Sequence, residues 1–284
     1  MQVKLEKQVA LKKYLPEIES SGLSVVGPVR EDNQDAIHLT QGEQPGALGW
    51  LFAVADGMGG YAHGGVASLL ALQSFSSTLQ SKNGASISKA LEKSVEAANL
   101  RVYQHAQRSN VGRMGTTLTA AYVSGNMLHL AHVGDSRAYL IRNGQATCLT
   151  TDHTMVGDMV RAKILSPDKI RTHAQRSILN KAIGIGLFVQ PDIIQKKLVE
   201  DDRLILCSDG VWSVIEDHEF AQIAGSDVPT GMISRNLIDL ALQYETDDNA
   251  SVVVFHLKKL GSVDAGNESQ QEVNWFQNLR KFLS

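Results

Sequence analysis

The chain contains the stretch Leu51-Phe52-Ala53-Val54-Ala55-Asp56-Gly57-Met58-Gly59-Gly60, and several of its other motifs repeat the same design. A short, uninterrupted apolar run bounded by turn residues predicts a buried β-strand. Asp56 then stands at the end of this strand, where its carboxylate can face solvent or a metal ion. The glycines after it let the backbone turn sharply and bring a carbonyl close to a ligand. The stretch therefore predicts a strand that delivers an acid and a backbone oxygen to one site.

An apolar run followed by an acid recurs along the chain. Two more runs end in Asp135 and Asp209, and Asp35 and Asp248 flank two further strand-like runs. A single Asp beside Gly or Asn is usually a turn residue, but the repetition favours a shared cluster of oxygen ligands. Such a cluster suits hard cations such as Mg²⁺ or Mn²⁺. Two of these ions about 3.5–4 Å apart can hold a water between them, lower its pKa and direct it at phosphorus.

Arg30 lies in the loop after the first strand-like run, beside Glu31 and Asp32. Alone, an Arg in such a loop is an ordinary solvated charge. Beside a carboxylate-rich metal site, its planar guanidinium can hold two oxygens of a phosphate group. Arg30 is therefore a candidate for phosphate binding.

Other kinds of phosphate chemistry lack their motifs in this sequence. A cysteine phosphatase needs an Arg that closes a phosphate loop after its Cys, but Thr154 and Ser213 occupy that position after Cys148 and Cys207. The glycines after Asp56 do not spell a dinucleotide fingerprint, and no Gly-Lys-Ser/Thr loop is present. We interpret both cysteines as structural.

The whole-chain properties are those of an ordinary globular protein of 284 residues with 43% hydrophobic residues. The net charge of −3 argues against nucleic acid as the main partner. No apolar run approaches the roughly 20 residues that span a bilayer, and Met1–Ser20 lacks the apolar block of a secretory signal. Two cysteines do not make a disulfide framework, so we expect a cytoplasmic protein. We also expect a monomer that does not span a membrane.

Hydrophobic periodicity predicts a mixture of helices and strands. Helices are expected at 63–79, 87–107, 217–224 and 230–244, and strands at 22–27, 116–123, 127–133, 138–142, 145–149, 203–208 and 251–257. Asn143-Gly144 is a strong hairpin signal between two of these strands. The clustering of antiparallel strands argues against a doubly wound parallel sheet.

Six motifs, taken in order, resemble those of a known family. They are Val29-Arg30-Glu31-Asp32-Asn33-Gln34-Asp35, Asp56-Gly57-Met58-Gly59-Gly60, Gly115-Thr116-Thr117, Gly134-Asp135-Ser136-Arg137, Ser208-Asp209-Gly210-Val211-Trp212 and Asp248-Asn249. Together they are similar to the motifs of the metal-dependent protein phosphatases of the 2C class, the PPM family, in its compact bacterial form. The resemblance implies an α+β fold, a four-layer α-β-β-α sandwich of two antiparallel sheets flanked by helices. It also implies hydrolysis of phosphoserine and phosphothreonine at a dinuclear Mn²⁺ or Mg²⁺ centre.

The resemblance implies a role for each acid of the set. Asp56 would bridge the two catalytic metals, and the Gly57 carbonyl would bind the second. Asp209 and Asp248 would hold the first. Asp35 would lie in the shell of the second metal, through water.

Three further features follow from the same resemblance. Asp135, with Asp209, would serve the third metal of bacterial members. Arg30 would bind the substrate phosphate. The segment 150–176 would form the variable flap beside the site.

The sequence departs from the family pattern just after Asp56. Many bacterial members carry a His directly after the two glycines, where this chain has Tyr61, and animal members carry one at the position of Met58. His63 lies nearby and is a candidate general acid, with Tyr61 and a metal-bound water as the alternatives. The Glu that often follows is replaced by Gly65.

The domain organisation expected from the resemblance has three parts. Residues 1–20 form an N-terminal extension, residues 21–259 the phosphatase domain, and residues 260–284 a linker with a short amphipathic C-terminal helix. The extension could instead add a strand to the edge of the domain. The tail helix could pack on the domain itself, or dock to a partner or a membrane surface.

The resemblance also implies partners, namely phosphorylated protein substrates and a serine/threonine kinase whose targets the enzyme shares. Two alternative functions remain open at this point. The altered segment after Asp56 is compatible with a catalytically weak regulator that binds phosphoproteins. A metal-dependent hydrolase of small phosphate esters is the other.

Overall fold

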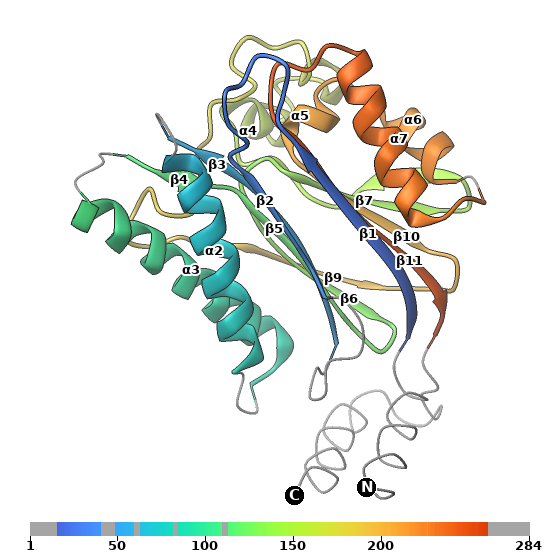
Figure 1. Ribbon diagram of the computed structural model, residues 1–284, viewed down its shortest axis with the longest axis horizontal. Helices are drawn as coiled ribbons and strands as arrows, with labels where there is room; N and C mark the ends of the chain where they lie inside the picture. The colour runs from blue at the N-terminus through green and yellow to red at the C-terminus, as the bar shows by residue number, and fades with distance from the viewer. Residues whose placement is uncertain are drawn as a thin grey trace, which may run out of the picture.

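The computed structural model of the chain describes residues 16–40, 49–59, 63–81, 85–109, 113–225 and 227–260. Two antiparallel sheets pack face to face, with helices on both outer faces (Figure 1). The expected α+β sandwich is therefore confirmed. Within the described residues, no helix is both long and apolar enough to cross a membrane.

The first sheet brings together strands from both ends of the described chain. Its order is β1 (Glu17–Val25), β11 (Ala250–Lys259), β10 (Arg203–Cys207), β7 (Arg137–Arg142) and β8 (Gln145–Cys148). The second sheet is built mostly from the first half. Its order is β2 (Asp35–Leu39), β3 (Trp50–Met58), β5 (Leu118–Ser124), β6 (Met127–Val133) and β9 (Asp192–Lys197), with β4 (Gly115–Thr116) paired to the end of β3.

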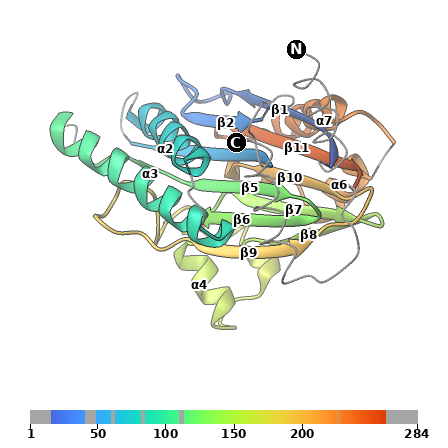
Figure 2. The same ribbon diagram turned by 90° about the horizontal axis from the view of Figure 1, so that it is seen from below.

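The helices form the two outer layers. They are α2 (His63–Gln80) and α3 (Ile87–Ser109) on the second sheet, and α6 (Asp217–Ala224) and α7 (Thr230–Gln243) on the first. The short α5 (Asp209–Trp212) follows β10 directly. In Figure 2, α4 (Met155–Arg161) projects from one side of the molecule, outside these layers. A short 3₁₀ helix, Pro167–Lys169, follows α4 in the flap.

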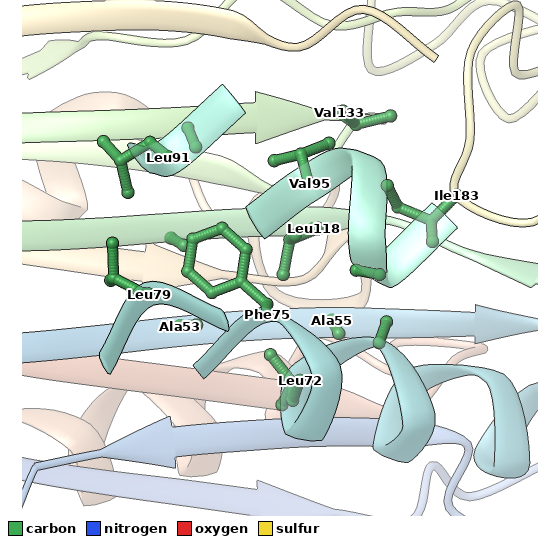
Figure 3. Packing of buried hydrophobic residues seen from close by; sticks show 14 of the residues in the cluster. Ala53, Ala55, Leu72, Phe75, Leu79, Leu91, Val95, Leu118, Val133 and Ile183 are labelled. Atoms are coloured by element: carbon green, nitrogen blue, oxygen red, sulfur yellow. The ribbon is translucent and has the colours of Figure 1, made fainter. Parts of the chain in front are cut away.

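The apolar run of β3 is continuous because both faces of this strand are buried. Ala53 and Ala55 face α2 and α3, where they pack near Phe75 (Figure 3). Phe52 and Val54 point the other way, into the core between the sheets, and the Phe52 ring centroid lies 4.9 Å from that of Phe255. This alternation is the two-residue period of a strand that is covered on both sides.

The structure confirms the predicted helices to within two residues and corrects several strands. β1 begins at Glu17, so residues 17–20, which we assigned to the N-terminal extension, belong to a sheet edge paired with β11. The strand expected at 116–123 is interrupted at Thr117. Asp56 lies two residues before the end of β3, because Gly57 and Met58 still pair with β4. Cys207 is buried, in agreement with a structural role.

Other expectations fall on segments outside the described residues. They concern residues 1–15, Tyr61, and the linker and helix at 261–284. The domain boundaries and the role of the tail therefore stay predictions.

Candidate active site

A cleft of about 920 Å³ gathers most of the residues that we predicted to form the site. Six of the eight candidate residues line it: Arg30, Asp56, Gly57, Asp135, Asp209 and Asp248. They come from the β1–β2 loop, β3, the turn after β6, the start of α5 and the turn before β11. Residues more than 200 positions apart in the sequence thus meet at one end of the sandwich.

The backbone of Asp56 is held by two consecutive threonines, Thr116 at the end of β4 and Thr117 between β4 and β5. Its N–H donates to Thr117 Oγ1 at 2.9 Å. Its carbonyl accepts from Thr117 N at 2.8 Å and from Thr116 Oγ1 at 2.8 Å. Because the backbone groups are satisfied within the sheet, the carboxylate is the group that Asp56 contributes to the cleft.

Gly57 is required by the close packing of backbone at this point. A Cβ built on Gly57 would lie 2.1 Å from the Gly64 carbonyl oxygen and 2.5 Å from that of Gln34. Any other residue would force β3 away from α2. Gly57 also lines the cleft, and the binding of a metal by its carbonyl stays a prediction.

Asp35 lies behind the cleft, opposite Asp56 in the register of β2 and β3. Ser208 donates its hydroxyl to Asp35 Oδ2 at 2.8 Å. The other oxygen, Asp35 Oδ1, is buried, as is Asp209 Oδ1, and neither has a hydrogen-bond partner among the described residues. A buried carboxylate oxygen without a partner is costly, and a cation would compensate both.

The pKa values of four acids rise because these groups are buried close together. Burial raises the pKa of Asp35 to about 7 and that of Asp209 to about 6, and charge on Asp248 adds to both. The pKa of Asp56 is raised well above its usual range by burial and then by the charges of Asp35 and Asp209. Asp135 is shifted in the same direction by burial and by Asp209. The negative charge of one carboxylate thus raises the pKa of another.

The donor set fits a hard divalent cation. It consists of carboxylate oxygens and one backbone carbonyl, the ligands that Mg²⁺ and Mn²⁺ prefer. Among the described residues, no three His, Cys, Asp or Glu side chains are already closed around a metal-sized space. Four of the acids, Asp56, Asp135, Asp209 and Asp248, nevertheless line the same cleft as the Gly57 backbone.

We expect the buried charge of Asp35 to weaken the metal-free protein as the pH rises. Since the folded state keeps this proton up to about pH 7, it binds more protons than the unfolded state above pH 4. Asp35→Asn should therefore become more stable relative to wild type by of order 2 kcal/mol between pH 5 and pH 7. Thermal or urea unfolding of both proteins in EDTA measures this difference.

The stability of Asp35→Asn is compared with that of the wild type at each pH because both proteins also contain buried histidines. These histidines change the free energy of unfolding in the opposite direction as the pH rises. Burial lowers the pKa of His132 to about 3, and it lowers that of His153 as well. Mn²⁺ at pH 7 should stabilise the wild type more than Asp35→Asn. A stability difference that does not change with pH would show that Asp35 is charged and compensated in the metal-free fold.

Arg30 reaches the site from the β1–β2 loop. Its Nη2 contacts Asp248 Oδ2 at 2.7 Å, and its Nε donates to the Asp247 carbonyl at 3.2 Å. Its side chain is 50% exposed, so the guanidinium is oriented by the protein and still open to a ligand in the cleft.

His63 is the first residue of α2, and it does not line the cleft. A Cβ built on Gly59, which does line the cleft, would lie 3.4 Å from His63 Cβ. The backbone thus brings His63 beside Gly59, but the role of His63 as an acid stays a prediction.

The structure adds cleft residues that sequence reasoning missed. Arg113 lines the cleft just before β4, and Ser177, Leu179 and Asn180 contribute from the segment that follows the flap. The positive charge of Arg176 lowers the pKa of Asp209 and so opposes the effect of burial, which raises this pKa. None of these has a local sequence signal, because their position depends on how distant segments fold back.

A buried network supports the Asp135 turn. Trp212 Nε1 donates to the Asp135 carbonyl at 2.8 Å, and the Arg137 guanidinium lies 3.5 Å from the Trp212 ring centroid. Arg137 bonds both oxygens of Asp152, at 2.9 and 2.6 Å. His153 also belongs to this network, because its backbone N–H donates to the Gly134 carbonyl at 2.8 Å. The base of the flap is thus tied to the turn that carries Asp135.

The sequence pattern of the protein phosphatase 2C family matches residues 22–158 and 185–250. The serine/threonine protein phosphatase PstP of Mycobacterium tuberculosis is 35% identical over 230 residues, which is 80% of this chain and 43% of that protein. The protein phosphatase PhpP of Streptococcus pneumoniae is 30% identical over 245 residues, which is 85% of this chain and 98% of that protein. The chain therefore spans less than half of the first relative and nearly all of the second.

Solved structures agree with the sequence comparison. The catalytic domain of PstP in complex with two manganese ions has a TM-score of 0.73 and 31% identity, and the match covers 84% of this chain and 97% of that one. The chain belongs to the protein phosphatase 2C family, the metal-dependent protein serine/threonine phosphatases. Mn²⁺ or Mg²⁺ is the cofactor that this family uses, in agreement with the oxygen-rich donor set of the cleft.

Proposed function

We propose that this chain removes phosphate from phosphoserine and phosphothreonine in proteins, using the cleft between Arg30 and the acids. The observation that carries the proposal is the convergence of Asp56, Asp135, Asp209 and Asp248 with Arg30 on one cleft. A phosphate monoester is a dianion, so a site for it must pair a guanidinium with cations that offset the acids.

The acids would hold the cations. Asp56 and the Gly57 carbonyl would bind on one side, and Asp209 and Asp248 on the other. Asp35 would act through water, and Asp135 with Asp209 would serve a third ion. Bound divalent ions supply Lewis acidity, which activates water as the nucleophile and offsets phosphate charge.

Arg30 would bind and orient the phosphoryl group. The guanidinium offers planar N–H pairs that match two phosphate oxygens. Its contact with Asp248 and the Asp247 carbonyl restricts its orientation before substrate arrives. Pre-orientation of this kind lowers the entropic cost of reaching a reactive geometry.

His63 is the candidate proton donor to the leaving alkoxide, with Tyr61 or water as alternatives. A positioned acid is worth about 10²–10⁴ in rate for a poor leaving group. An aryl ester such as p-nitrophenyl phosphate expels a stable anion and needs little such help. His63→Ala should therefore slow phosphothreonine-peptide hydrolysis at least about tenfold more than p-nitrophenyl phosphate hydrolysis.

The control for this variant is His218→Ala, which removes an exposed histidine from α6. It should leave both rates unchanged. If His63→Ala slows both substrates equally, or neither, the proton comes from Tyr61 or water.

A turnover assay with a phosphothreonine peptide tests the function. Free phosphate released over many turnovers supports the phosphatase, whereas tight metal-dependent binding with negligible turnover would favour the phosphoprotein-binding regulator. A strong preference for small metabolite esters over peptides would favour a metal-dependent hydrolase of small phosphate esters. Within this proposal the enzyme acts as a cytoplasmic monomer and opposes a serine/threonine kinase on shared targets.

A further inference from the structure

The cleft carries a basic side chain that the proposed mechanism does not use, Arg113. The other charged residues that line the cleft in the described part of the chain are Arg30 and six acids: Glu31, Asp32, Asp56, Asp135, Asp209 and Asp248. Arg30 is already engaged by Asp248. Arg113 is therefore the second cation of an acid-rich cleft.

Arg113 has no protein partner among the residues that the structure describes. Its side chain is exposed, and it forms no hydrogen bond or ion pair with any of them. The adjoining segments 60–62 and 110–112 contain no Asp or Glu. The guanidinium is thus available to an anion that enters from outside.

The backbone that carries Arg113 is nonetheless firmly placed. Met114 is buried, and the next two residues form β4, which pairs with Gly57 and Met58. Thr116 and Ile183 exchange two backbone hydrogen bonds, of 3.1 and 2.9 Å. Since the anchor is one residue away, Arg113 stays at the cleft even though its own side chain is free.

Arg113 and Arg30 approach the cleft from different sheets. Arg30 is bound to the turn before β11 in the first sheet, whereas Arg113 precedes β4 beside β3 of the second. The Arg113 carbonyl lies 3.6 Å from the point where a Cβ on Gly59 would be. The backbone of Arg113 thus lies beside Gly59, whereas Arg30 is held at the turn before β11.

The wall beside Arg113 also has an apolar part. Ile185 lines the cleft, and its Cδ1 would lie 2.8 Å from a Cβ on Gly115. The aliphatic side chain therefore covers β4 next to Arg113. A surface of this kind suits a peptide segment better than a small anion.

We propose that Arg113 determines specificity by binding an anionic side chain of the protein substrate, near the phosphorylated residue. The inference rests on the proposed function, because the cleft must accept a phosphoprotein. A guanidinium pairs with a carboxylate and with a second phosphate in the same way, through paired N–H donors. Without Arg113, Glu31 and Asp32, the lining acids to which we assign no metal, would repel such a group.

The test is a series of phosphothreonine peptides in which one flanking position is Glu, a second phosphothreonine or Gln. The modified position is moved along both sides of the target residue, and kcat and KM are measured with Mn²⁺. We expect one or two positions at which the anion lowers the wild-type KM about two- to fivefold relative to Gln. Arg113→Ala should remove this preference without changing kcat for the Gln peptides.

Three controls separate specificity from a general effect. Arg108→Ala removes an exposed arginine at the end of α3, outside the cleft, and should keep the preference. Arg113→Lys should retain part of it. Hydrolysis of p-nitrophenyl phosphate, which has no flanking residue, should be the same in all variants. Glu and phosphothreonine peptides compared at the same position identify which anion is preferred.

The outcomes distinguish this inference from the proposed function. Hydrolysis of the Gln peptides by the wild type establishes the phosphatase whatever Arg113 does. Equal KM values for Glu, phosphothreonine and Gln at every position would overturn the inference. So would a preference that survives Arg113→Ala, or a parallel loss of p-nitrophenyl phosphate hydrolysis.

Discussion

Asp209→Asn is expected to reduce hydrolysis of a phosphothreonine peptide by at least about a hundredfold, because even groups that only support a metal ligand cost 10–100-fold when removed. Asp209 lies at the start of α5, lines the cleft and carries a buried oxygen without a partner among the described residues. An amide is uncharged and binds hard cations poorly. The measurement is the rate of phosphate release at saturating Mn²⁺.

The same variant should stay folded. Burial and neighbouring charge raise the pKa of Asp209 to about 6, so its ionisation at neutral pH lowers the stability of the metal-free fold relative to the unfolded chain. The neutral isostere removes that cost, and unfolding in EDTA should show equal or higher stability. Asp239→Asn, on the exposed face of α7, is the control and should keep full activity. Undiminished activity in Asp209→Asn would contradict the metal assignment.

Asp152→Ala is expected to lower the free energy of unfolding by about 3–5 kcal/mol, the cost of leaving one member of a buried ion pair alone. Asp152 is buried and accepts both hydrogen bonds of the Arg137 fork. Its removal leaves a guanidinium inside the protein, over the Trp212 ring. For a domain of this size the melting temperature should fall by about 10 °C.

Asp158→Ala is the matched control. Asp158 also pairs with an arginine, Arg161, but both side chains are more than half exposed. Exposed pairs contribute at most about 1 kcal/mol. Replacing Arg137 and Asp152 together by apolar residues should recover much of the loss, because no unpaired charge remains. Equal effects of Asp152→Ala and Asp158→Ala would contradict the importance of the buried pair.

The acids of the site were predictable because each follows a local pattern. Asp56, Asp135 and Asp209 come at or near the end of apolar strands, and strand ends are where a sheet opens to a cleft. That Asp35 faces Asp56 was not predictable from local pattern, because it depends on the register of β2 against β3. Asp56 itself lies inside β3 because the two-residue β4 extends the pairing, and so short a strand has no sequence period.

The parts that were missed depend on contacts between distant segments. β9 was not predicted because none of its residues is buried and two of them are lysines. The bond from Trp212 to the Asp135 carbonyl joins residues 77 positions apart. In the sequence, Arg113 has the pattern of an ordinary loop charge. It lies at the cleft because β4, which follows it, pairs with β3. Sequence patterns identify what a strand carries, whereas the walls of the cleft are set by tertiary packing.

The most direct test of the metal-dependent phosphatase site is a titration of Mn²⁺ into metal-free protein, with the initial rate of phosphate release from a phosphothreonine peptide as the readout. The site described here predicts negligible release in EDTA and a saturable rise with Mn²⁺. It also predicts binding of at least two ions per chain by calorimetry. Phosphate release that is equally fast without metal, or saturating Mn²⁺ binding without phosphate release, would contradict it.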